Sequence, residues 1–144
     1  MKRFLSLIML GMFLISCSSD DLDTQKNNIC EDVSEIVSDE FFQLIETTNY
    51  HITDLEISDN CLRISVSSSG CDPTNWNMKL FSTNSFYTVQ PYERILKIEL
   101  NNNQSCLAVF EKSVSFDLIP YQIQGQSETP LHIVGWNEPI IYRY

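Results

Sequence analysis

Histidine is the side chain best suited to proton transfer near neutral pH, and the chain has two, His51 and His132. A nucleophile–histidine–acid set would need one of them in a pocket beside a serine or cysteine. Both lie in strand-like segments, where alternation with apolar neighbours turns them outward. The serine motif GxSxG does not occur. We therefore predict that the chain is not an enzyme, and a small hydrolase assembled from distant residues is an alternative.

Carboxylates are the next candidates, because paired acids can serve sugar hydrolysis or hold metal ions. Adjacent acids stand at Asp20/Asp21, Glu31/Asp32 and Asp39/Glu40. Neighbouring residues on a strand point to opposite faces, so such pairs do not face each other across a cleft. No CxxC pair, EF-hand spacing or glycine-rich phosphate loop occurs. The sequence predicts neither a metal site nor a cofactor.

Cys17 is the most specific candidate for chemistry. Lys2 and Arg3 precede an apolar run from Phe4 to Ile15 that has the length of a secretory signal and is too short to span a membrane. The run ends in Leu14-Ile15-Ser16-Cys17, which resembles a bacterial lipobox. The resemblance implies cleavage before Cys17, a diacylglycerol on its sulfur and a fatty acyl group such as palmitate on the new N-terminus. Two or more acyl chains anchor a protein stably. The alternative is an ordinary secretory signal with an incidental cysteine.

The residues after Cys17 suggest a location. Ser18-Ser19-Asp20-Asp21 resembles the signal that follows the lipidated cysteine in surface-displayed lipoproteins of the Bacteroidota type, which implies display on the outer membrane. The alternative is a solvated tether at the periplasmic face. We expect a signal peptide at residues 1–16, a flexible acidic tether at 17–28 and a β-sandwich domain at 29–144.

Charge excludes one class of partner. Removing residues 1–16 takes two basic residues away and leaves seven against 19 acidic ones, a net charge of −12 on 128 residues. No basic stripe is present, so we predict no nucleic-acid binding. The remaining length suits one domain with a single core.

The other four cysteines form an even set in an exported, oxidising setting, and two disulfides are expected. If the strands run up and down in order, Cys71 and Cys106 lie at one end of the sandwich and Cys61 at the other. A strand of about seven residues spans about 20 Å, whereas a disulfide needs Cα atoms within about 7 Å. This geometry favours Cys71–Cys106 and leaves Cys30 for Cys61, with the two other pairings still open.

Short alternating segments separated by turn residues predict an all-β fold. Strand-like segments are Tyr50 to Ile57, Leu62 to Ser68, Trp76 to Leu80, Ile95 to Leu100, Cys106 to Leu118, Leu131 to Val134 and Ile140 to Tyr144. The alternation slips once near Asp54, which fits a bulge. We predict an antiparallel β-sandwich of about seven strands, Ig-like or similar, with a small barrel as the rival. Ile36 to Ile45 is either a strand or a short helix capped by Ser38.

Aromatic residues are the candidates for ligand binding. Trp76 alternates with Met78 and Leu80, so we expect it in the core. Trp136 sits in a turn, where it either stacks on a sugar or a partner protein, or folds back over the sandwich. Tyr87 and Tyr92 lie in another loop-like stretch and either form an exposed patch or cover one end of the fold.

The strings CLRISVSSSGCDPTNW (61–76), CLAVFEKSVSFDLIP (106–120) and PIIYRY (139–144) are similar to a group of short uncharacterised lipoproteins of the Bacteroidota type. The shared features are an SGC turn followed by Trp, a C-x-A strand and an FDL segment. The resemblance implies a lipoprotein β-domain and carries no activity. We therefore expect a lipid-anchored, non-enzymatic binding module for a protein or glycan. An enzyme inhibitor acting through a loop such as 72–75 or 82–92 is the alternative.

Overall fold

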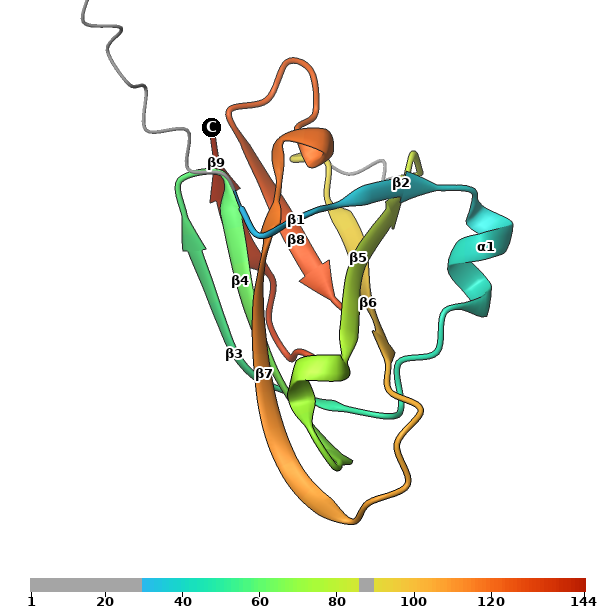
Figure 1. Cartoon of the computed structure of the whole chain (residues 1–144). Helices are drawn as coiled ribbons and strands as arrows, with labels where there is room; N and C mark the ends of the chain where they lie inside the picture. Colours follow the sequence, from blue (N-terminus) through green and yellow to red (C-terminus); the bar gives the residue numbers. More distant parts are fainter. Residues whose placement is uncertain (1–29, 86–89) are drawn as a thin grey trace, which may run out of the picture.

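Two β-sheets pack face to face (Figure 1) in a computed structural model that describes residues 30–85 and 90–144. The strands are β1 (Asp32–Val33), β2 (Glu35–Val37), β3 (His51–Ser58), β4 (Cys61–Gly70), β5 (Asn77–Thr83), β6 (Arg94–Asn101), β7 (Ala108–Asp117), β8 (Glu128–Ile133) and β9 (Ile140–Arg143). One helix, α1 (Asp39–Leu44), and 3-10 turns at Pro73–Asn75 and Ile119–Tyr121 complete the described chain. None of its helices is long and apolar enough to cross a membrane.

The all-β sandwich with one short helix is confirmed, and its sheets are mixed. One sheet has the order β1-β7-β4-β3 and the other β2-β5-β6-β8-β9. The pairs β1/β7, β2/β5 and β6/β8 are parallel, whereas the remaining pairs are antiparallel. The expected antiparallel sandwich of about seven strands is a sandwich with three parallel pairs among the antiparallel ones, and its described part has nine strands. β1 and β2 are too short to show a period, and the β6/β8 pairing depends on a long connection.

β4 shows why this sequence forms a sandwich. Leu62, Ile64 and Val66 are fully buried on its inner face, as the alternation predicts. Burying side chains of this size stabilises a fold by about 1.5–3 kcal/mol each. Trp76 is also in the core, at 2% exposure, as expected. The predicted bulge in β3 is confirmed, because its register with β4 shifts between Ile52 and Asp54.

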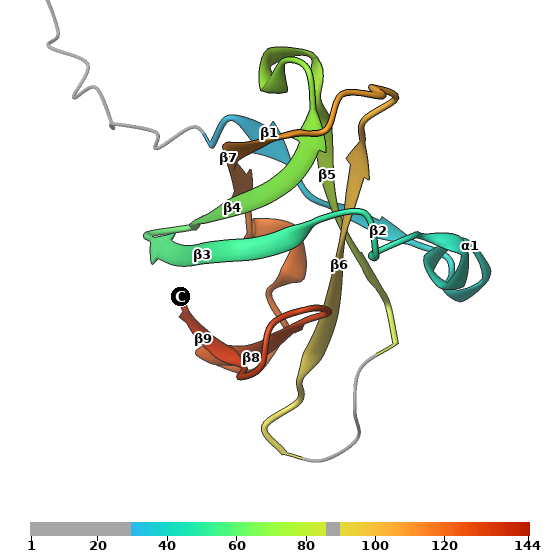
Figure 2. The ribbon, with the colours of Figure 1, turned by 90° about the horizontal axis from the view of Figure 1, so that it is seen from below.

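Contacts join the two sheets at both open sides of the sandwich. On one side the chain passes from β1, paired with β7, to β2, paired with β5, with only Ser34 between the two strands. The Ser34 hydroxyl donates to the carbonyl oxygen of Asp117. On the other side, where the edge strands β3 and β9 lie (Figure 2), the Tyr142 hydroxyl of β9 donates to Asn60 Oδ1 in the turn before β4 at 2.6 Å. These contacts hold the two sheets together, and β1, β3, β2 and β9 remain the edge strands of the sandwich.

The segment left ambiguous by the sequence is helical. The Ser38 hydroxyl accepts a hydrogen bond from the backbone N–H of Phe41, as an N-cap does. Phe42 and Ile45 are buried against Phe81 in a small second core. Leu44 points away from that core and is 78% exposed.

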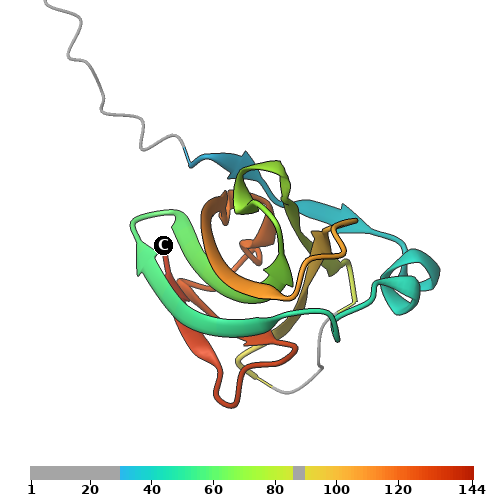
Figure 3. The same cartoon turned by 60° about the horizontal axis from the view of Figure 1, so that its bottom comes forward.

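Two disulfides mark opposite ends of the molecule. Cys30 is bonded to Cys61, the first residue of β4, with the Cα atoms 5.6 Å apart. Cys71, which follows the last residue of β4, is bonded to Cys106 at a Cα distance of 5.0 Å. The geometrically favoured pairing is therefore confirmed. We call these the Cys30 end and the Cys71 end; Figure 3 turns the Cys71 end, at the bottom of Figure 1, toward the viewer.

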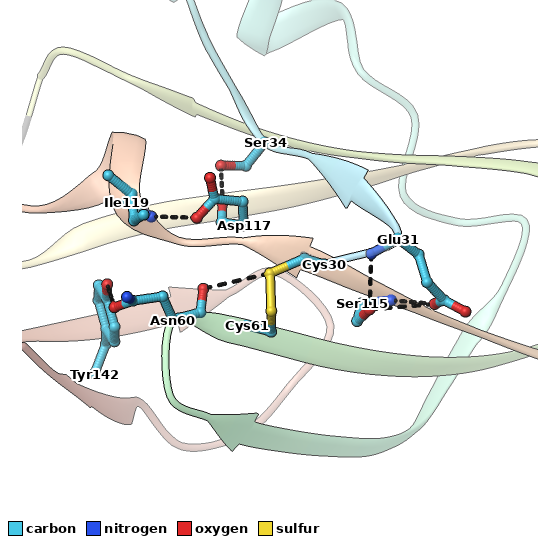
Figure 4. The surroundings of a disulfide bond; sticks show 9 residues. All are labelled: Cys30, Glu31, Ser34, Asn60, Cys61, Ser115, Asp117, Ile119 and Tyr142. Atoms are coloured by element: carbon cyan, nitrogen blue, oxygen red, sulfur yellow. Dashed lines mark hydrogen bonds between the residues drawn. A yellow bond between two sulfur atoms is a disulfide. The ribbon is translucent and has the colours of Figure 1, made fainter. Parts of the chain in front are cut away.

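The Cys30 end is tied down by a dense set of contacts (Figure 4). The N–H of Glu31 donates to Ser115 Oγ at 3.0 Å, and the N–H of Ser115 donates back to Glu31 Oε2 at 2.7 Å. Cys30 Sγ lies 3.8 Å from the carbonyl oxygen of Asn60. The segment that leads into β1 is thus fixed both covalently and by hydrogen bonds.

Candidate functional site

Two hollows adjoin each other at the Cys71 end. The first has a volume of about 380 Å³ and is lined by residues 48–51, by Ser67–Ser69 of β4 and by Val109 of β7. The second, of about 330 Å³, is lined by Leu44, Glu46 and residues 99–103 at the end of β6. Asn49 lines both hollows, so we treat them as one surface, the Cys71-end groove.

The floor of the groove is fixed by side chains that donate to backbone carbonyl oxygens. The bonds are Asn49 Nδ2 to Leu100 (2.9 Å), Tyr50 Oη to Ile98 (2.8 Å), Ser68 Oγ to Asn49 (2.7 Å) and Asn102 Nδ2 to Ser69 (2.7 Å). Burial raises the pKa of Tyr50 to about 12, so its phenol stays protonated and continues to donate. These bonds clamp the segment before β3 to both sheets, and they give the groove a defined shape.

The rim of the groove presents polar groups that the fold does not use. Within the described part of the chain, the side chains of His51, Ser67, Ser69, Asn101 and Asn103 have no hydrogen-bond partner. They offer hydroxyl, amide and imidazole groups to solvent. Such groups can bind sugar hydroxyls, a peptide backbone or charged side chains.

Ser67 lies between a histidine and an acid, so these three residues are a candidate catalytic triad. In the strand register His51 is opposite Ser67, and Ser67 is opposite Glu111. In a catalytic triad the histidine stands between the serine and the acid, whereas here the serine is in the middle. Glu111 instead accepts a hydrogen bond from Thr53 Oγ1 at 2.9 Å. The order of the strands therefore makes a polar face and does not assemble a triad.

Gln104 organises the loop beside the groove. Its Oε1 accepts from the N–H groups of Cys71 (2.6 Å) and Asp72 (2.9 Å) and from Trp76 Nε1 (3.2 Å). Asp72 caps the following 3-10 turn, and hydrogen bonds from the Thr74 side chain and backbone lower the pKa of its carboxyl. Together with the disulfide, these bonds order residues 71–76. The sequence offered no signal for Gln104, which stands in a stretch that predicts only a turn.

The aromatic candidates lie at different places. Trp136 is 38% exposed in the β8–β9 loop. This loop lies beside the start of β3, because a Cβ atom built on Gly135 would be 3.7 Å from Ile52 Cδ1. Tyr92 is partly buried, and its N–H donates to Gln126 Oε1 at 2.6 Å toward the Cys30 end. The structure therefore does not bring Trp136 and Tyr92 together.

The histidines are placed as the alternation suggests. His51 is exposed at the first hollow. His132 is partly buried on β8, with Nε2 2.7 Å from Glu93 Oε2. No group of three or more His, Cys, Asp or Glu side chains in residues 30–85 and 90–144 is arranged to hold a metal ion. Cys17, the segments 1–16 and 17–28, and Tyr87 lie outside the described residues.

No family model and no curated protein matches the chain. Among solved structures, a protein of unknown function, DUF1344, from Bacteroides vulgatus ATCC 8482 has a TM-score of 0.51 and 18% identity over 79% of this chain and 55% of that one. A protein from Parabacteroides distasonis ATCC 8503, described as "putative TOXIN related protein", has a TM-score of 0.50 and 15% identity over 80% and 60%. The chain spans little more than half of each, and the likeness establishes a shared sandwich fold alone.

Proposed function

We propose that this protein is a non-enzymatic, lipid-anchored lipoprotein of the bacterial outer membrane that binds a protein or glycan in the Cys71-end groove. The observation that carries the proposal is the position of the groove. It lies at the end of β4 opposite Cys30, the residue at which the expected tether joins the fold. Ten residues of β4 at about 3.3 Å each separate the two ends by about 30 Å.

This arrangement has a simple rationale for an anchored protein. A lipid on Cys17 holds the Cys30 end near the membrane through a tether of about a dozen residues. The groove then points away from the bilayer, and its unused polar groups face the surroundings. The acidic surface adds repulsion from an anionic membrane, which favours this orientation.

The anchor is tested by labelling cells with an alkyne analogue of palmitate. We expect the wild-type protein to incorporate the label and to fractionate with the outer membrane. Cys17→Ser should lose both properties, whereas Cys71→Ser/Cys106→Ser should keep them. An unlabelled wild-type protein, or a free thiol at Cys17 in the mature chain, would reject the anchor.

The site is tested by filling the first hollow. Ser69→Trp places a large ring where the hydroxyl of Ser69 now faces solvent, opposite Val109. Wild-type protein and variant are compared for binding to envelope glycans and to envelope proteins, with Ser127→Trp near the Cys30 end as the matched control. We expect Ser69→Trp to remove at least about 90% of the binding and the control to retain it. Equal binding by both variants would place the ligand elsewhere.

An enzyme inhibitor is the second candidate, and the order of the loop at residues 71–76 favours it. A loop held by a disulfide, a capping carboxylate and Gln104 is organised before any partner arrives, which lowers the entropy cost of binding. The test is inhibition of envelope-degrading hydrolases by the wild-type protein but not by Thr74→Arg. Failure to inhibit any hydrolase of the panel would remove this candidate.

A further inference from the structure

Exposed aliphatic side chains line both hollows of the Cys71-end groove, and another precedes Val109 by two residues. Leu107, directly after the bonded Cys106, is 92% exposed, and Val109, which lines the first hollow, is 72% exposed. Leu44 lines the second hollow and is 78% exposed. Large aliphatic side chains gathered around a hollow are typical of a surface that contacts a partner.

The polar part of the groove carries negative charge. Glu46 and Glu99 line the second hollow, and Glu111 stands beside Ser67 at the first. None of the described residues that line either hollow is a lysine or arginine. Two lysines are nearby: Lys112 directs its ammonium group to the carbonyl oxygen of Trp76, and Lys79, opposite Glu99 in the strand register, is paired with Glu35 Oε1 at 3.2 Å. The groove therefore attracts cations, and the net charge of −12 expected for the processed chain reinforces the attraction at long range.

These features favour a protein segment over a sugar. Sugar rings stack on exposed aromatic faces. Tyr50 lines the first hollow but is buried, and the exposed Trp136 is not among the residues that line either hollow. Leu44 and Leu107 are best buried by apolar side chains of a partner. The carboxylates pair best with ammonium or guanidinium groups, and the asparagine amides form hydrogen bonds with a peptide backbone. A chain that alternates basic and apolar residues meets both requirements.

We propose that the partner of the Cys71-end groove is a basic protein that presents an exposed segment of mixed cationic and aliphatic residues. The cations lie over Glu46 and Glu99, and aliphatic side chains cover Leu44 at one end and Leu107 with Val109 at the other. This inference rests on the proposed function, since it assumes that the groove is the binding site, and it names the class of ligand.

The test uses the lipidated protein in nanodiscs of zwitterionic lipid, with empty nanodiscs as reference. The probes are three 12-residue peptides with alternating Lys/Leu, Lys/Ser and Glu/Leu. We expect Lys/Leu to bind about tenfold more tightly than either of the others, and to weaken as salt rises. Glu46→Gln/Glu99→Gln and Leu44→Ser/Leu107→Ser should each weaken Lys/Leu binding about tenfold. Glu128→Gln/Ile119→Ser, the matched control at the Cys30 end, should leave it unchanged.

Three results would overturn the inference. Equal binding of the Lys/Leu and Glu/Leu peptides would show that charge does not select the partner. An equal loss of Lys/Leu binding in the control variant would show that the peptide does not bind in the groove. Binding of envelope glycans that Ser69→Trp abolishes, without peptide binding, would reject the basic partner and leave the proposed function standing. If Ser69→Trp changes no binding at all, the proposed function itself fails.

Discussion

The two disulfides offer a matched pair of perturbations, because they close loops of similar length in separate parts of the chain. Cys30 and Cys61 are 31 residues apart, and Cys71 and Cys106 are 35 apart. Loop-closure entropy in the unfolded chain predicts a loss of about 3.7 kcal/mol at 25 °C for the first bond and about 3.8 kcal/mol for the second. The two loops do not overlap, so the losses should add when both bonds are removed.

The native contacts around each bond decide how the variants depart from that estimate. β1 has two residues and β2 has three, and the hydrogen bonds between Glu31 and Ser115 are exposed to solvent, so without Cys30–Cys61 this segment should open locally. At the other end, Gln104 still holds Cys71 and Asp72 by hydrogen bonds after the bond is removed. We therefore expect similar global losses from the two double Cys→Ser variants, with faster amide exchange at Glu31, whose N–H donates to Ser115 Oγ, only in the first.

The assay is guanidinium unfolding at 25 °C for the free energy, and native-state hydrogen exchange for the local opening. Native domains typically have about 5–15 kcal/mol of stability, so each variant should remain folded in water. A loss below about 1 kcal/mol for either variant would refute the unfolded-state argument. Unchanged amide exchange at Glu31 without Cys30–Cys61 would show that the segment before β1 stays in place without the disulfide.

Two further predictions concern single side chains. Gln104→Ala removes the acceptor for two backbone N–H groups and for Trp76 Nε1, together with the Nε2 donor to the Asp72 carbonyl oxygen, and should cost about 1–3 kcal/mol by thermal or guanidinium unfolding. Gln104→Glu loses the Nε2 donor but keeps the acceptor, so it should cost less. Equal costs would contradict the role of Oε1. Tyr50 has a pKa of about 12 in the fold against 10.0 in an unfolded chain, so its stabilising effect is complete below pH 10 and falls as the pH rises toward 12. Tyr50→Phe should therefore lose less stability than wild type between pH 9 and pH 11, and parallel losses would contradict the assignment.

Long, regular patterns made much of the fold predictable. The alternation in β4 placed Leu62 and Ile64 in the core, and a single slip of phase near Asp54 located the bulge. The disulfides followed from which strand ends lie on the same side. The helix at Asp39–Leu44 was predictable as an option, because Ser38 is a good cap but the aromatic residues after it suit a strand equally well.

The site was less predictable, because its parts come together only in three dimensions. Gln104 contributes through bonds to residues more than 25 positions away, and no local pattern announces them. Strands as short as β1 have no period to detect. The groove depends on Asn49, Ser69 and Asn102 being clamped to neighbouring backbone, and such bonds to carbonyl oxygens leave no trace in spacing or composition.

The Cys30–Cys61 bond also determines how the domain bears a mechanical load. A pull on the chain before Cys30 passes through the sulfur atoms directly into the first residue of β4. It then runs along β4, which is paired with β7 over ten residues and with β3 on its other side, so many ladder bonds resist it in shear rather than opening one after another. β4 ends beside Cys71 and the groove. Tension between a held N-terminus and a partner bound in the groove is therefore carried along β4, which has a disulfide at each end. β1 and β2 lie outside this path.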